Sequence, residues 1–300
     1  MSRLVKSHRL ALVGALALFA AACGNQEQGG GSASAPASES PDAAVAHSIQ
    51  LLRKGDFNAL VEASVPPSQL EQAKAHWMNE FKKEEVTDES RAEFAETMAK
   101  LTAPDAEEQM MAEIRPQLEQ FQGEMRAQLP AMVAMGKGFV LAAIDESEDI
   151  KPENKPQVTN LVNALGTWAE SGEFANIDRA ETAVAEITAA ARKMPVRTLD
   201  ELHALDFNGM MNAVSIGYGG LKGVLKAYDI DMDATLENAR VETISQEGDN
   251  AKVRVHIEFL GAPLNFDTEL VRVDGRWYGK DTLANLDKLM VDQESTTDAS

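Results

Sequence analysis

Apolar residues recur at spacings of three and four from about residue 43 to residue 232. Such spacing places them on one side of a helix, so this region is predicted to be a series of amphipathic helices. Local boundary signals divide it further. Gly55 is expected to end the first helix, Asp56 to cap the second, and Thr87 or Asp88 to cap a later one.

The longest helical pattern runs from residue 102 to residue 144. Pro116 and Pro130 predict kinks or breaks within it. Its apolar positions form one stripe, which predicts the seam of a helical hairpin or bundle. The members of this stripe are Met111, Ile114, Leu118, Phe121, Met125, Leu129 and Met132.

Near Ala239 the apolar period changes to two, which is typical of strands. Apolar residues alternate with polar ones between Lys252 and Phe259, predicting a sheet with one buried and one wet face. Asp274 and Gly275 are a strong hairpin signal. We therefore expect an α+β fold, with a mostly α-helical body (43–232) followed by a small C-terminal antiparallel β-sheet (233–290) packed on it and a disordered tail (291–300).

Residues 10–22 are wholly apolar and follow a basic start without acids, as in a secretory signal. The run is shorter than the roughly 20 residues that span a membrane. Ala20, Ala21 and Ala22 lead directly into Cys23, the only cysteine of the chain. This arrangement resembles the lipobox of bacterial lipoproteins.

The resemblance implies that residues 1–22 are removed and that Cys23 receives the lipid. Gly24 after the cysteine implies sorting to the outer membrane, where the protein would face the periplasm. Residues 23–42 then form the lipid anchor and a flexible polar linker. The alternative is an ordinary signal peptide that leaves a free cysteine.

The chain carries a formal net charge of −20. The predicted signal contributes basic residues only, so its removal makes the protein still more acidic. An acidic surface repels phosphates, which argues against nucleic acid as a partner and against strong attraction to anionic lipid headgroups.

The segments "LLRKGDFNAL" (51–60) and "VRVDGRWYGKD" (271–281) resemble the start and end of small secreted α+β domains of the nuclear-transport-factor type. In that plan, a helix ending in a Gly-Asp turn precedes a curved sheet ending in a Gly-x-Trp strand. Here the helical body stands between the two segments, so the resemblance informs only the fold of the C-terminal sheet.

Asp229, Asp231 and Asp233 alternate as at the start of a calcium loop. Such a loop also needs glycine at its sixth position and glutamate at its twelfth, where this chain has Ala234 and Arg240. We therefore predict that Asp233 caps a short helix and that the other two acids are solvated.

Other motifs lead to no chemistry. The segment "GYGGLKG" (217–223) lacks both the dinucleotide and the Walker pattern, so close helix packing is expected. Met132 and Met135 could ligate copper(I), but their spacing predicts core packing. No histidine or cysteine pair has metal-site spacing and no nucleophile elbow occurs. We predict no catalytic residue, metal or cofactor.

The leading interpretation is a non-enzymatic, lipid-anchored envelope protein that binds an unknown protein partner through its helical body. One alternative is a small-ligand binder for a lipid or metabolite, with a pocket lined by Phe259, Phe266, Trp277 and Tyr278. Another is an immunity-type inhibitor of a toxic enzyme. Core packing is the default expectation for Trp277 because of its size.

Overall fold

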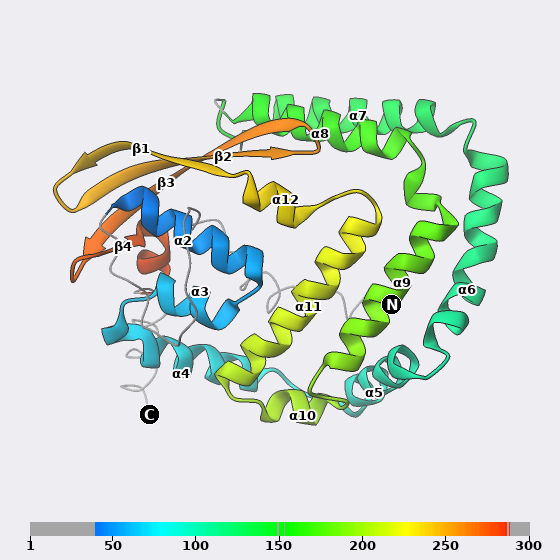
Figure 1. Cartoon of the computed structure of the whole chain (residues 1–300), viewed down its shortest axis with the longest axis horizontal. Helices are drawn as coiled ribbons and strands as arrows, with labels where there is room; N and C mark the ends of the chain where they lie inside the picture. The colour runs from blue at the N-terminus through cyan, green and yellow to red at the C-terminus, as the bar shows by residue number, and fades with distance from the viewer. Residues whose placement is uncertain (1–39, 149, 153, 287, 289–300) are drawn as a thin grey trace.

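The computed structural model describes residues 40–148, 150–152, 154–286 and 288, and Figure 1 shows their arrangement. Helices precede a four-stranded antiparallel sheet, which confirms the α+β class and the order of its two parts. The helical elements that precede the sheet are α2 (Pro41–Lys54), α3 (Phe57–Ser64), α4 (Pro67–Lys83), α5 (Asp88–Thr102), α6 (Ala106–Gln120), η2 (Phe121–Met125), α7 (Leu129–Glu146), α8 (Lys155–Glu170), η3 (Glu173–Ala175), α9 (Ile177–Lys193), α10 (Leu199–Ala204), α11 (Phe207–Ala227) and α12 (Met232–Glu237), and residues 280–286 after the sheet are also helical.

The sheet is an antiparallel meander of β1 (Arg240–Glu247), β2 (Asn250–Phe259), β3 (Ala262–Val273) and β4 (Arg276–Gly279). Val253 and Val255 are buried, whereas Arg254 between them pairs with Asp267 on the wet face, so the predicted alternation is confirmed. The β3–β4 turn has positive φ at Asp274 (50°) and Gly275 (81°), as a two-residue hairpin turn requires.

The first described helix packs against the last part of the chain. Val45 and Ile49 of α2 form one core with Val253, Leu270 and Trp277 of the sheet. In Figure 1 the blue helix α2 accordingly lies beside the orange strands. The first of the two segments from which the nuclear-transport-factor resemblance was drawn begins in α2, which packs on the sheet, but its Leu51 and Phe57 pack with Met211 of α11.

Several helix boundaries follow the local signals. Gly55 ends α2 in the left-handed conformation, Asp56 caps α3 by accepting from the Ala59 amide at 3.0 Å, and Thr87 caps α5. One boundary differs from expectation: because Ser40 provides a cap, α2 begins at Pro41 inside the predicted linker. The short helix expected near Asp233 is α12, which begins at Met232.

The predicted seam between residues 102 and 144 is wrong at its C-terminal end. Pro116 lies within α6 without ending it, but η2 and a turn follow, and α7 leaves at 92° to the preceding helical segment. The stripe therefore loses its partner after Leu129, the first residue of α7. Met111 and Leu129 are buried, whereas Met132 is 43% exposed.

Helices α9 and α11 lie side by side, and small residues permit the contact (Figure 1). A Cβ atom built on Gly220 would lie 2.6 Å from Cβ of Ala190, which is closer than two carbon atoms can approach. The glycine-rich segment of α11 therefore serves helix packing, as its sequence predicted.

Asp267 on the wet face gives the sheet an expected pH dependence. Hydrogen bonds from Arg254, and to a smaller extent from Lys252, lower the pKa of Asp267 to about 2. Its unfolded pKa is about 3.9, so the ionised form contributes stability above about pH 4 that is lost as the pH falls to about 2. We expect Asp267→Asn to destabilise the protein by about 1 kcal/mol at pH 7.

The measurement is chemical denaturation of parent and variant between pH 7 and pH 2. The difference between them should shrink as the pH falls below about 4. Glu258→Gln is the matched control, because Glu258 is exposed on β2 opposite Pro263. A difference that stays constant down to pH 2 would contradict the role given to the Asp267 carboxylate.

Candidate functional site

A groove of about 490 Å³ lies between α8 and the turn that joins β2 to β3. One wall is a row of side chains on α8, and the other is the turn itself. A quarter of the whole chain is charged, yet none of the groove residues carries an ionisable side chain. The groove is lined by Asn160, Asn163, Ala164, Thr167, Trp168, Leu260, Gly261, Ala262 and Pro263.

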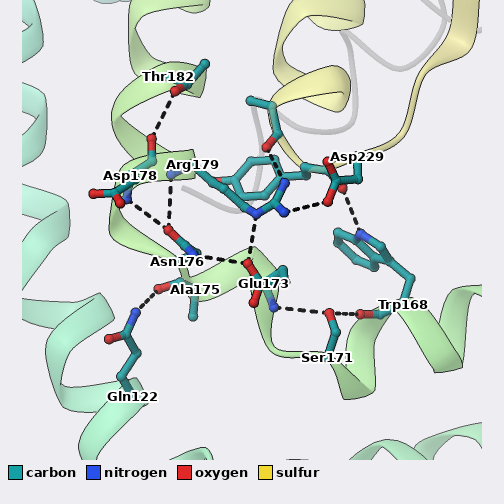
Figure 2. A network of polar contacts seen from close by, with 12 residues as sticks. Gln122, Trp168, Ser171, Glu173, Ala175, Asn176, Asp178, Arg179, Thr182 and Asp229 are labelled. Atoms are coloured by element: carbon teal, nitrogen blue, oxygen red, sulfur yellow. Dashed lines mark hydrogen bonds and ion pairs between the residues drawn. The ribbon is translucent and has the colours of Figure 1, made fainter.

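The two walls of the groove are held in place by polar contacts. The Asn265 amide of β3 donates to Oε1 of Gln157 on α8, with an N to O distance of 2.5 Å. The indole Nε1 of Trp168 donates to the carbonyl oxygen of Tyr228 at 2.9 Å, which fixes the ring beside the groove (Figure 2). The groove is therefore built on restrained elements.

Arg179 stands at the centre of the network that supports Trp168 (Figure 2). Its guanidinium donates to Oε2 of Glu173 at 2.8 Å, to the Ala227 carbonyl at 2.9 Å and to Oδ2 of Asp229 at 2.5 Å. These contacts join η3, the start of α9 and the end of α11. They also hold Asp229 in the left-handed conformation next to Tyr228.

The charge of Arg179 is compensated within this network. Asp229 first, and Glu173 second, raise the pKa of Arg179, and Arg179 in turn lowers the pKa of both acids. Two carboxylates thus compensate one guanidinium. The network has the character of a structural clamp, because its one cation is already occupied by the chain's own acids.

The second candidate surface is the side of α7 that points away from α8. Met132, Met135 and Phe139 follow one another at helical spacing and are 43%, 63% and 71% exposed. We call this surface the outward face of α7 and define it by Ala131, Met132, Met135, Phe139, Ala142 and Ala143, all of which are exposed.

The charge distribution on α7 is reversed from that of an ordinary surface helix. Lys137 is the only ionisable residue between residues 130 and 143, and it points inward. Its Nζ lies 3.8 Å from Oε1 of Glu170 on α8, and its aliphatic chain lies over Gly166. A helix normally turns its charges to water and its apolar face to the core. An exposed apolar patch of this kind marks an interaction site.

Within the described residues, no single helix has the length and hydropathy needed to cross a membrane. The α6–η2 segment and α7 meet that test only when taken together, and they are bent by 92°. The apolar composition that passes this test lies mainly in α7, because α6 contains many acids.

The three alternating aspartates do not converge on a site. Asp229 pairs with Arg179, Asp231 with Lys226 and Asp233 with Lys222. Asp231, rather than Asp233, caps α12 by accepting from the Ala234 amide at 2.9 Å. Asp229 and Asp231, the two acids expected to be solvated, each pair with a cation, and the Asp229 side chain is also 71% exposed. Among the described residues, no group of three metal-ligating side chains is found.

The pocket residues expected from the sequence are not those of the groove. Trp277 and Tyr278 are buried in the core, which confirms the default expectation for Trp277. Phe266 is 51% exposed on the sheet, and Phe259 is half-buried; neither lines the groove. Met132 and Met135, expected in the core, are exposed because α7 packs chiefly on α8. Cys23 lies outside the described residues.

Comparisons with protein families, with curated proteins and with solved structures find no match to this chain. The assignment of a function therefore rests on the chain's own residues.

Two signals in the sequence could have pointed to these surfaces. Asn160, Asn163 and Thr167 form a polar row at helical spacing within α8. Residues 129–144 contain a single ionisable residue, Lys137, which is unusual for a helix at the protein surface.

Proposed function

We propose that this chain is a non-enzymatic binding protein of the cell envelope, anchored through a lipid at Cys23 and held against the membrane by the outward face of α7. The membrane would be the outer membrane, seen from the periplasm. The observation that carries this proposal is the orientation of α7, whose only central charge points inward while Met135 and Phe139 point outward.

The outward face of α7 would contact the lipid surface rather than water. An apolar helix face lying in the plane of a bilayer places its side chains in the boundary between headgroups and acyl chains. The α7 helix is 18 residues long, so its outward face would extend over about 27 Å in the plane of the bilayer surface.

The lipid anchor would bring this face to the membrane. The chain between Cys23 and Ser40 can extend to at most about 60 Å. A bilayer surface is therefore within reach of the folded body. One apolar helix face alone binds reversibly, and stable attachment takes two signals, so the lipid and α7 would act together.

The charge of the protein selects the kind of lipid. Asp145 and Glu146 end α7 and are exposed, and the whole chain is strongly acidic. Anionic headgroups would repel this surface. The outward face of α7 therefore suits a zwitterionic lipid surface, which offers the same hydrocarbon without the negative potential.

We expect the chain from residue 23 onward with Cys23→Ser to lose stable membrane attachment but to float reversibly with phosphatidylcholine vesicles. Adding Met135→Glu and Phe139→Glu should lower vesicle binding at least tenfold, because two apolar side chains of the outward face become charged. The measurement is vesicle flotation over a range of lipid concentrations. Replacing part of the lipid with phosphatidylglycerol should weaken binding.

The matched control is Leu221→Glu with Ile244→Glu, since these are exposed apolar residues on other elements. It should leave flotation unchanged, and all variants should keep the helical circular dichroism of the parent. Absence of flotation, or equal loss in the control, would overturn the contact of α7 with lipid. Retention of Cys23→Ser in washed membranes would overturn the lipid anchor.

A further inference from the structure

We propose that the groove between α8 and the β2–β3 turn binds a neutral saccharide. The inference concerns a surface separate from the outward face of α7 and does not depend on membrane attachment. The groove has a volume of about 490 Å³ and is largely open to solvent.

The polar wall of the groove matches sugar hydroxyl groups. Asn160, Asn163 and Thr167 are spaced by three and four residues, so their side chains lie in one row along α8. The amides of Asn160 and Asn163 both donate and accept hydrogen bonds, as sugar hydroxyl groups do, and the Thr167 hydroxyl, which donates to the Asn163 carbonyl, can still accept one. A row of them can therefore bind successive hydroxyl groups without regard to charge.

The apolar part of the groove matches the carbon skeleton of a sugar. Trp168 contributes an aromatic ring whose position is fixed by the bond from its Nε1 to Tyr228. Leu260, Ala262 and Pro263 form the facing wall. A sugar ring has an apolar face of C–H groups between its hydroxyl groups, and such a face can lie on an aromatic ring and on aliphatic side chains.

Other ligand classes fit the groove less well. The absence of ionisable side chains among its lining residues leaves nothing to compensate the charge of a phosphate or carboxylate. The nearby cation Arg179 is held by Glu173 and Asp229. An acyl chain would displace the water bound to the amides of Asn160 and Asn163. It offers these amides no hydrogen bonds in return, which is unfavourable.

The test is isothermal titration of the full chain with three neutral trisaccharides, namely maltotriose, cellotriose and triacetylchitotriose, at up to millimolar concentrations. We expect at least one of them to bind. Asn160→Ala and Asn163→Ala should each weaken binding roughly 2- to 10-fold, the effect of one lost hydrogen bond. Ala164→Phe should abolish binding, because its ring would occupy the groove.

Asn79→Ala is the matched control, since Asn79 is exposed on α4 and far along the chain from the groove. It should bind as the parent does, and the melting temperatures of all variants should be compared to confirm folding. Failure of all three trisaccharides to bind overturns the inference. So does binding that Ala164→Phe leaves intact, or binding of decanoate in place of the sugars.

Discussion

Replacing Trp277 with alanine should lower the free energy of unfolding by about 3–5 kcal/mol. Its side chain is 4% exposed and packs with Val45 and Ile49 of α2. Removing it would leave a cavity between α2, the first described helix, and the C-terminal sheet. Because that core joins α2 to the sheet, its loss should affect the whole cooperative transition.

The measurement is urea denaturation followed by circular dichroism, which reports both helix and sheet. Phe266→Ala is the matched control, because Phe266 lies on β3 of the same sheet but is 51% exposed. Its effect should stay within about 0.5 kcal/mol, as for most surface substitutions. Equal midpoints for Trp277→Ala and the parent would show that this core does not hold the fold.

Gly220→Val should destabilise the protein by about 1–3 kcal/mol, the usual cost of adding atoms to a close-packed contact. The new Cβ would lie 2.6 Å from Cβ of Ala190 on α9, and neither atom can move without its backbone. The helices α9 and α11 would have to separate. Valine has a better helix propensity than glycine, so propensity alone predicts the opposite sign.

Gly219→Val separates packing from propensity. It introduces the same residue one position away, where a Cβ would meet nothing within 4 Å. We expect its melting temperature to equal or slightly exceed that of the parent. A similar loss of stability in both variants would indicate that helix propensity, rather than the contact with Ala190, decides the effect.

The surfaces proposed for binding were only partly readable in the sequence. The row of Asn160, Asn163 and Thr167 is local, because helical spacing alone places it on one side of α8. The facing wall, Leu260 to Pro263, lies about a hundred residues later in the chain. Nothing local indicates that these two segments meet, so the groove itself could not be predicted.

The sequence by itself determined those features that depend on residues close together in the chain. Asp56 caps α3 through a bond to a residue three positions away, the Asp274–Gly275 turn depends on its own backbone, and the alternation from Lys252 to Phe259 follows from the geometry of a strand. Each interaction spans a few residues, and local pattern therefore predicts it.

Only the tertiary structure decided which side chains are covered. Met135 and Phe139 carry the same apolar character as Met111, but the 92° bend before α7 removes the partner that would bury them. Asp229 looks like a metal ligand until Arg179, fifty residues earlier, pairs with it. Burial and charge pairing depend on residues distant in the chain, whose approach no local pattern specifies.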